Sequence, residues 1–271
     1  MTTSMTATGP GWLFVPADRP ERYGKAIEAA DLAIIDLEDA VRPEDKDTAR
    51  ELLVTSPLDP QRVCVRINGF DTAHVASDLD AVRERGITRV MVPMAEADHP
   101  FESLTGLEVI ALIETARGVI EADRIAAHQQ VSALALGSAD LALNLRIRST
   151  GNSTMPASDP LAYARTRILY AARACGLSVI DSVHSTVDDD SGLRGEADAA
   201  AAQGFDGKLA IHPRQIDPIR SAFAPRAEEL DWAQSVMSEA RSRSTGAFVL
   251  DGELVDEVII RRAEMLLAHG N

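Results

Sequence analysis

Two carboxylates stand directly after apolar segments in the middle of the chain. Glu114 follows the run "EVIALI", and Asp140 comes just after "VSALALG". Such runs are typical of strands buried on both faces, where an unpaired charge is costly. If the two strands are neighbours in a parallel sheet, roughly 5 Å apart, both carboxylates enter one small volume. They then repel each other unless a cation joins them.

The neighbouring residue types indicate which cation would fit. Neither carboxylate has a Cys or His beside it, so the ligands would be oxygen atoms. Oxygen ligands suit Mg²⁺, with water and substrate completing an octahedron. Two other interpretations remain open on spacing alone. A carboxylate at a strand end can cap the next helix, or it can pair with a nearby arginine, and Arg117 is available.

Arg66 ends a third apolar segment, "RVCVR". Its guanidinium could pair with a substrate carboxylate or an enolate oxygen, unless Glu38 already binds it. The segment "DLEDA" supplies Asp36, Glu38 and Asp39, whose side chains alternate in direction and so cannot all face one space. We expect these three residues to accept hydrogen bonds from metal-bound water or from Arg66.

A basic group lies near the N-terminus, in "ADRPERYGKA". Arg19, Arg22 and Lys25 follow the first apolar segment, and Arg22 and Lys25 share one helix face. In an acidic chain such a group suggests a phosphate-bearing ligand at the edge of the site. Three charges alone are, however, more often a solvated helix face.

These side chains need elements that carry them to one place. Apolar strand-like runs alternate with helical patterns in eight units from Gly11 to Phe223, which predicts an α/β fold of the (β/α)₈ TIM-barrel type. An open doubly wound sheet is the alternative, but its Gly-rich first turn is missing. We predict a disordered tail over 1–10, the catalytic barrel over 11–223, and a C-terminal helix–hairpin–helix extension over 224–271. The extension would pack on the barrel or on a neighbouring subunit.

Composition limits the partners. The net charge of −15 and the aromatic content of 4% argue against nucleic acid and against anionic membranes. Cys64 lies in an apolar strand pattern and is expected in the core, and the usage of two cysteines fits a reducing compartment. The first ten residues lack the pattern of a signal peptide, and no run is long enough to span a bilayer. We therefore expect a cytoplasmic protein.

A family resemblance covers nearly the whole chain from Gly11. Its motifs, in order, are "FVPADRPERYGKA", "IIDLEDAVRPEDK", "VRING", "ALIETARGV", "GSADL", "GFDGKLAIHPRQI" and "GAFVLDGELVD". Together they resemble the citrate lyase β-subunit-like group of the HpcH/HpaI aldolase superfamily, which includes malyl-CoA and citramalyl-CoA lyases. The resemblance implies a TIM barrel, Mg²⁺, reversible carbon–carbon cleavage of a 3-hydroxyacyl thioester, and a homotrimer or hexamer.

The resemblance also implies roles for single residues. Glu114 and Asp140 match the metal ligands, and Arg66 matches the substrate-binding arginine, with Glu114 also beside the substrate. Arg19 and Lys25, with Arg22 between them, match the region that holds the CoA phosphates. Asp256 matches an aspartate that serves as acid or base in a neighbouring subunit's site. Its alternative role is to cap the helix that begins near Glu257.

The predicted function is therefore a Mg²⁺-dependent lyase that converts citramalyl-CoA or malyl-CoA to acetyl-CoA and a 2-oxo acid. One alternative is a citrate lyase β subunit that acts on a citryl thioester of an acyl-carrier protein. Another is a catalytically silent barrel with an assembly or regulatory role. Ala139 replaces the Glu that relatives commonly carry, and residues 142–158 lack the usual Leu-Gly turn. Both departures lie beside the expected metal site and leave the acyl group open.

Overall fold

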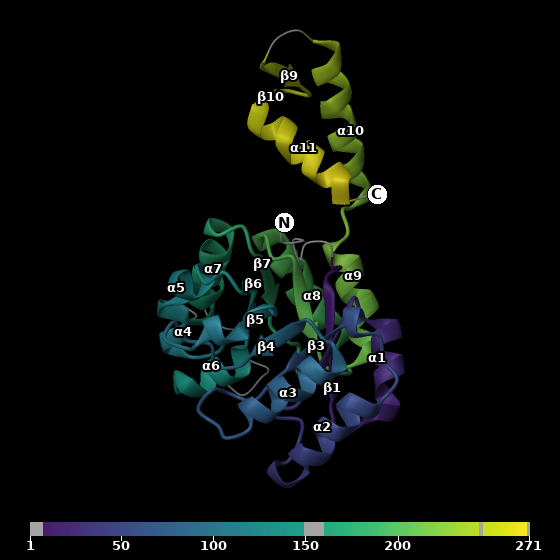
Figure 1. The fold of residues 1–271 in the computed structure, drawn as a ribbon. Helices are drawn as coiled ribbons and strands as arrows, with labels where there is room; N and C mark the ends of the chain where they lie inside the picture. The colour runs from purple at the N-terminus through teal and green to yellow at the C-terminus, as the bar shows by residue number, and fades with distance from the viewer. Residues whose placement is uncertain (1–7, 149–159, 244–245, 270–271) are drawn as a thin grey trace. The chain divides into compact units, whose positions relative to one another are not determined.

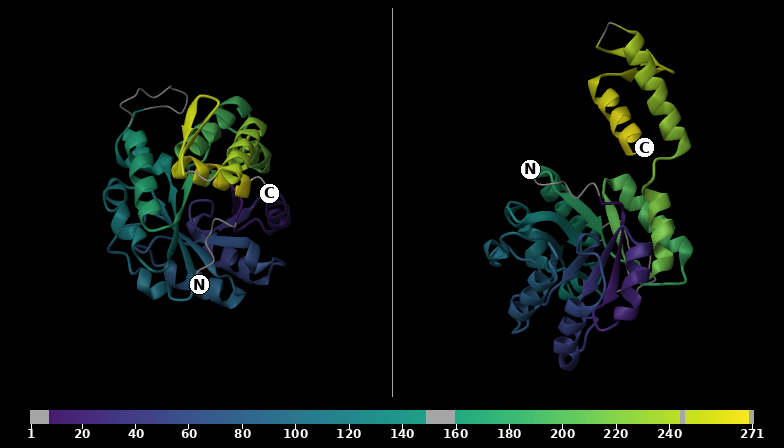
Figure 2. Two further views of the ribbon diagram at one scale, coloured as in Figure 1. Left: turned by 90° about the horizontal axis from the view of Figure 1, so that it is seen from above. Right: turned by 45° about the vertical axis from the view of Figure 1, so that its right-hand side comes forward.

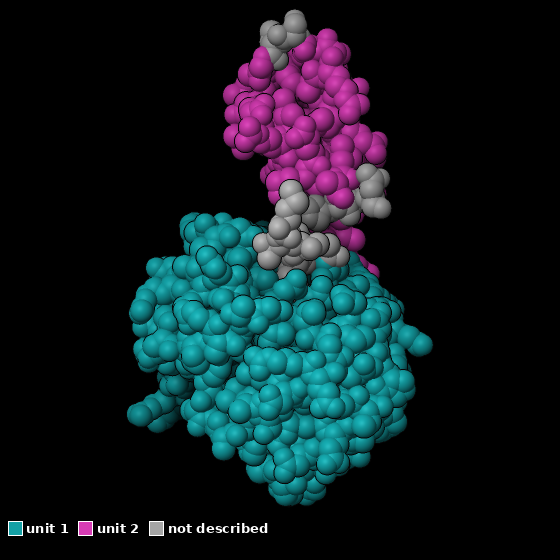
Figure 3. Space-filling model, viewed as in Figure 1, with its two compact units in different colours: residues 1–220 teal, residues 221–271 magenta. Residues whose placement is uncertain are grey.

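The computed structural model describes residues 8–148, 160–243 and 246–269. The chain forms two compact units, Met1–Arg220 and Ser221–Asn271 (Figure 3). Each unit has its own core and is described by itself.

The first unit is a closed barrel of parallel strands in the order β1 to β8, with β8 pairing with β1. This confirms the predicted (β/α)₈ fold. The strands are β1 (Gly11–Pro16), β2 (Leu32–Asp36), β3 (Val63–Arg66), β4 (Arg89–Val92), β5 (Glu108–Ile113), β6 (Val131–Leu136), β7 (Ser178–Asp181) and β8 (Gly207–Ala210).

Helices surround the strands (Figures 1 and 2). They are α1 (Tyr23–Ala29), α2 (Lys46–Thr55), α3 (Val75–Arg85), α4 (Ala116–Ile120), α5 (Ala122–Ala126), α6 (Ser138–Asn144), α7 (Pro160–Ala174), α8 (Asp190–Gln203) and α9 (Ile216–Phe223). After β4 the connection holds a 3₁₀ helix, Phe101–Leu104, in place of an α-helix. Within the described residues, no helix has the length and apolar character needed to cross a membrane.

The barrel interior is filled by apolar side chains that alternate along the strands with those facing the helices. Trp12, Ile34, Met91, Ile110 and Leu209 belong to this cluster, together with Cys64, which is buried as expected. Because this interior is packed, the open space of the barrel lies at the ends of the strands.

Strand register decides which side chains meet at those ends. Asp36 is the cross-strand partner of Arg66 on β2 and β3. Ile113 is the partner of Leu136 on β5 and β6, so the next residues, Glu114 and Gly137, lie side by side.

The second unit is the predicted helix–hairpin–helix. It consists of α10 (Ala227–Ser242), the antiparallel strands β9 (Phe248–Leu250) and β10 (Glu253–Val255), and α11 (Glu257–His269). Asp251 and Gly252 form the hairpin turn, and both have positive φ, as a type I′ turn requires. Its core comprises Ala233, Val236, Phe248, Val255 and Ala263.

Candidate active site

A cavity of about 420 Å³ opens at the carboxyl ends of the barrel strands. Charged side chains at or just after the ends of β2, β3, β5 and β6 form one part of its wall: Asp36, Asp39, Arg66, Glu114 and Asp140. Apolar residues on and after β1, β7 and β8 form much of the remainder: Phe14, Pro16, Val183, Leu209 and Ile211. In a barrel of this kind, substrate sites occupy this end of the strands.

Glu114 is held in place by the backbone around it. Only 2% of the residue is exposed. The Met94 N–H, in a segment with left-handed backbone (φ 48°), donates to Glu114 Oε1 at 2.8 Å. On the other side, a Cβ at position 137 would overlap Glu114 Oε2, so Gly137 leaves the space that this carboxylate occupies.

The two alternative roles of Glu114 are filled by other residues. Thr115 caps α4, because its Oγ accepts from the Gly118 N–H at 2.9 Å. Arg117 pairs with Glu96 and Asp98 at 2.9 and 2.8 Å rather than with Glu114. The buried charge therefore serves neither as a helix cap nor as the partner of Arg117.

Asp140 lies in the first turn of α6, half-buried, on the same cavity wall as Glu114. Burial, reinforced by the charges of Glu38 and Asp140, raises the pKa of Glu114 to about 8. Burial likewise raises the pKa of Glu38 to about 7, with Asp39, Asp36 and Asp140 adding to the effect against Arg66. The carboxylates of this cavity are thus crowded and incompletely neutralised.

This donor set fits a hard divalent cation. The described lining of the cavity offers carboxylate oxygens and includes neither Cys nor His. Glu114 and Asp140, which line the same cavity, could together hold Mg²⁺, because carboxylates are its preferred protein ligands and a cation would remove their mutual repulsion. Glu38 lies close enough to raise the pKa of Glu114 electrostatically, and it would lie near the metal without binding it directly.

Arg66 is largely occupied by acidic partners. Its Nε and one terminal nitrogen donate to Asp36 at 2.7 and 2.6 Å, and the other terminal nitrogen lies 2.7 Å from Glu38 Oε2. The guanidinium carbon also lies 4.9 Å from the ring centre of Phe14. The expected pairing of Arg66 with Glu38 is present as an ion pair, and the hydrogen bonds to Asp36 use two of its five N–H groups.

The three acidic residues of "DLEDA" have different roles. Each carboxylate oxygen of Asp36 accepts two hydrogen bonds, from Arg66 and from the backbone of Glu38 and Ala40. Asp36 therefore fulfils the expected role towards Arg66, and has no lone pair left for metal-bound water. Asp39 is mostly exposed and lies 3.8 Å from Arg66.

A second cavity of about 320 Å³ adjoins the first and contains part of the basic group. Arg22, Lys25 and His212 line it, and it shares Phe14, Pro16 and Ile211 with the first cavity. Arg19 is not part of this lining; it is exposed, and its Nε lies 3.9 Å from Asp18. The structure therefore places two of the three predicted basic residues next to the carboxylate cavity.

Asp256 belongs to the second unit and caps its last helix. Its Oδ1 accepts from the N–H groups of Val258 and Ile259 at 3.0 and 3.2 Å. Asp256 is thus a helix cap within the single chain, as the alternative interpretation expects. Both capping hydrogen bonds go to the same carboxylate oxygen, Oδ1.

Another charged network lies outside the cavity lining. Lys208 on β8 is fully buried and contacts Asp181 at 2.8 Å and Glu196 at 3.1 Å. Arg165 on α7 binds the other oxygen of Asp181 at 2.5 Å, and His184 lies 3.1 Å from Glu196. Here the buried carboxylate of Asp181 has two cationic partners, and Lys208 lowers the pKa of Glu196, whose side chain is 45% exposed.

Comparison with known proteins places this geometry in a family. The sequence model of the HpcH/HpaI aldolase/citrate lyase family matches residues 11–213, which span the barrel strands and both cavities. The chain belongs to this family.

Similar members of the HpcH/HpaI family cover the whole length. A citrate lyase subunit beta-like protein of Mycobacterium tuberculosis is 44% identical over 97% of this chain and 96% of its own. A (3S)-malyl-CoA thioesterase of Cereibacter sphaeroides is 33% identical over 94% and 92%. The crystal structure of CitE from Mycobacterium tuberculosis in complex with magnesium, acetoacetate and coenzyme A has a TM-score of 0.89 at 44% identity, covering 98% of this chain and 99% of that chain.

Within this HpcH/HpaI barrel, the sequence reasoning missed several cavity residues. Val183 and Ile211 line the first cavity but carry no chemical signature, since apolar residues near strand ends are common. The Met94 N–H is a backbone donor, which sequence does not reveal. Ala139 lines the cavity and is exposed, whereas residues 149–158 of the unusual 142–158 segment lie outside the described residues.

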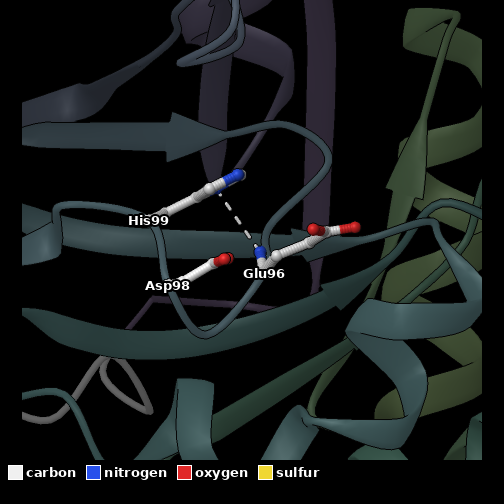
Figure 4. A group of neighbouring side chains, drawn as sticks. All are labelled: Glu96, Asp98 and His99. Atoms are coloured by element: carbon white, nitrogen blue, oxygen red, sulfur yellow. Dashed lines mark hydrogen bonds between the residues drawn. The ribbon is translucent and has the colours of Figure 1, made fainter.

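Glu96, Asp98 and His99 form a further group after β4 (Figure 4). Their potential ligand atoms lie within 4.8 Å of one another, and the Glu96 N–H faces His99 Nδ1 at 3.4 Å. Arg117 binds both carboxylates of this group, which supplies the positive charge that a metal would otherwise bring. We interpret this group as an ion-pair network at the surface.

Proposed function

We propose that this protein is a Mg²⁺-dependent carbon–carbon lyase that cleaves a 3-hydroxyacyl-CoA thioester, of the citramalyl-CoA or malyl-CoA type, to acetyl-CoA and a 2-oxo acid. The observation that carries the proposal is the pairing of two cavities. One contains Glu114 and Asp140 in an oxygen-only wall, and the other, adjoining it, contains Arg22 and Lys25. A metal-chelating acid and a phosphate-bearing thioester would occupy them together.

The residues of the chain have distinct tasks in this reaction. Mg²⁺, held by Glu114 and Asp140, would supply Lewis-acid stabilisation of the substrate's oxygen atoms. Arg66, fixed by Asp36 and Glu38, would use its other N–H groups to stabilise the negative charge that develops when the bond breaks. Apolar residues of the same cavity, among them Phe14, Val183 and Leu209, reduce the water around these groups, which strengthens the interactions.

Product analysis tests the proposal against its neighbours in the family. We expect purified protein with Mg²⁺ to convert citramalyl-CoA or malyl-CoA to acetyl-CoA and a free 2-oxo acid, both followed by chromatography. A relative at 33% identity is named a malyl-CoA thioesterase. Release of free CoA and malate without 2-oxo acid would therefore assign hydrolysis instead of cleavage. Turnover only with acyl-carrier-protein thioesters would support the citrate lyase β-subunit alternative, and no turnover would support the silent barrel.

The basic cavity predicts how CoA is held. Lys25 and Arg22 are proposed to bind CoA phosphates, with Arg19 exposed beside them. Lys25→Glu should weaken CoA-thioester binding by roughly tenfold or more, because it reverses a charge at a phosphate, and should leave binding of the short 2-oxo acid unchanged. The matched control for this charge reversal is Arg261→Glu, at an exposed position of α11, and it should leave both affinities unchanged. Lys46→Glu would not serve, because Lys46 is buried. Equal losses for both ligands in Lys25→Glu would contradict the assignment.

Asp256 is proposed to act in the active site of a neighbouring subunit of a homotrimer or hexamer. There it would transfer a proton to or from the enolate carbon of the bound thioester. Asn caps a helix about as well as Asp, so Asp256→Asn should preserve thermal stability. If Asp256 is the acid or base, the same variant lowers kcat by roughly 10²–10⁴-fold. Mixing Asp256→Asn with Arg66→Ala subunits should restore part of the activity. Verified mixed oligomers without recovery would show that Asp256 does not act across subunits.

A further inference from the structure

The carboxylate cavity is divided into two chemically different parts. Val183 after β7 and Leu209 on β8 extend the apolar packing of the barrel interior up to the cavity wall. Ile211 lies further out and is 41% exposed. Together with Phe14 on β1, these side chains form an apolar surface, which we call the apolar wall, facing the same space as Glu114 and Asp140.

Positive charge in this cavity is already committed. Among the described residues that line it, Arg66 is the one Lys, Arg or His side chain. Asp36 accepts two of its N–H groups, Glu38 lies 2.7 Å from its third nitrogen, and the proposed reaction assigns its other N–H groups to the reacting oxygen atoms. No cation of the described cavity lining is then left for a second carboxylate. The other charged lining residues, Asp39, Glu114 and Asp140, are all acidic.

This charge balance discriminates between 2-oxo acids. Every 2-oxo acid presents one carboxylate and one carbonyl oxygen, which the Glu114–Asp140 side can accept through a shared cation. A dicarboxylic 2-oxo acid carries a second carboxylate. The cavity offers it either acidic neighbours or the apolar wall, because Arg22 and Lys25 of the adjoining cavity are assigned to the CoA phosphates. Both are unfavourable, because like charges repel and an ion without a partner loses its hydration. An alkyl group in the same place gains free energy by leaving water.

We infer that, if the proposed lyase reaction holds, the cavity selects 2-oxo acids and acyl thioesters whose remaining substituent is an alkyl group, methyl or longer. Dicarboxylic 2-oxo acids are disfavoured, and Val183, Leu209 and Ile211 are the residues that determine this specificity. The inference makes a citryl thioester, which releases a four-carbon dicarboxylic 2-oxo acid, a poor substrate.

Matched pairs of ligands test the inference by binding rather than turnover. Calorimetry with Mg²⁺ present should compare 2-oxobutyrate with oxaloacetate, and 2-oxovalerate with 2-oxoglutarate. Each pair has equal chain length and exchanges a methyl group for a carboxylate. We expect the monocarboxylate to bind roughly 10- to 100-fold more tightly in each pair, as one unpaired like-charge contact predicts. Equal or tighter binding of the diacids overturns the inference while leaving the lyase proposal intact.

Variants locate the cause. Val183→Lys places a cation on the apolar wall and should reduce or reverse the preference within each pair. Ile211→Lys provides the same test at an exposed position in case the first variant does not fold. Tyr170→Lys on α7, where the side chain is 72% exposed, is the matched control and should keep the wild-type preference. An unchanged preference in both folded wall variants overturns the assignment of these residues. If Mg²⁺ binds but no 2-oxo acid does, the proposed function itself fails, and the inference with it.

Discussion

Glu114 and Asp181 are both buried carboxylates of the barrel, but Asp181 has cationic partners and Glu114 has none among the described residues. Burial raises the pKa of Glu114 to about 8, with other carboxylates adding to the shift. Arg165 and Lys208 bind the two carboxylate oxygens of Asp181, and Lys208 also lowers the pKa of Glu196, whose side chain is 45% exposed. Asp181, a buried acidic residue outside the cavity lining, therefore has cationic partners, whereas the carboxylates that line the cavity lack enough positive charge to neutralise them. The difference teaches that burial alone does not single out a functional carboxylate, and that burial without a compensating cation is what makes Glu114 a candidate.

A variant that removes the Glu114 carboxylate from the cavity should have the largest effect on Mg²⁺ binding and on the lyase rate. Glu114→Gln retains an oxygen for the Met94 N–H, and it replaces a group that is mostly protonated at neutral pH without metal. We expect loss of Mg²⁺-dependent stabilisation and a fall in lyase rate of more than roughly 10³-fold, because Lewis-acid catalysis contributes several kcal/mol. The metal-free protein should melt at or above the wild-type temperature.

Scanning calorimetry with and without Mg²⁺ checks this prediction, with Asp140→Asn as the second variant. Asp98→Asn, in the group that Arg117 neutralises, is the matched control and should respond to Mg²⁺ as wild type does. A wild-type Mg²⁺ response in Glu114→Gln would contradict the metal assignment.

Removing Lys208 should destabilise the buried ion-pair network around Asp181. Lys208→Met leaves Asp181 buried with only Arg165, and we expect a loss of about 3–5 kcal/mol in the free energy of unfolding. The double variant Asp181→Leu/Lys208→Met should recover part of this loss, since it removes both buried charges. Arg261→Met, from the exposed pair with Glu257, should cost less than about 1 kcal/mol. Urea titration measures all three, and a single-variant loss as small as that of Arg261→Met would refute the distinction between the two regions.

Changing pH should give the smallest and most specific effect. In the unfolded chain Glu38 and Glu114 release protons near pH 4.5, whereas in the folded, metal-free protein they retain them to about 7 and 8. Between these values the folded state binds more protons, so its stability falls as pH rises. We expect the melting temperature in EDTA to drop by several degrees from pH 5 to 8.5, and Glu114→Gln to drop less. Parallel curves for the two proteins would argue against the raised pKa of Glu114.

The sequence predicted the barrel because its period of strand and helix is strong and because neighbouring strands bring their ends together. This reasoning brought Glu114 and Asp140 to one cavity without any knowledge of side-chain contacts. It could not assign separate roles to the acidic residues of "DLEDA". Asp36 accepts hydrogen bonds from the backbone of its own loop and from Arg66, and these contacts depend on the fold. Lys208 did leave a signal, a lysine inside an apolar strand, but its partners come from other elements.

The left-handed backbone at Met94 turns one amide into a spectroscopic reporter. Its N–H points at Glu114 Oε1, so its proton resonance depends on how much electron density that oxygen carries. The chain has 7 methionines, and selective ¹⁵N-methionine labelling would therefore give a sparse amide spectrum in which this signal can be assigned by substitution. Titration of the carboxylate or arrival of a cation would then be read from a single peak, without any substrate or turnover.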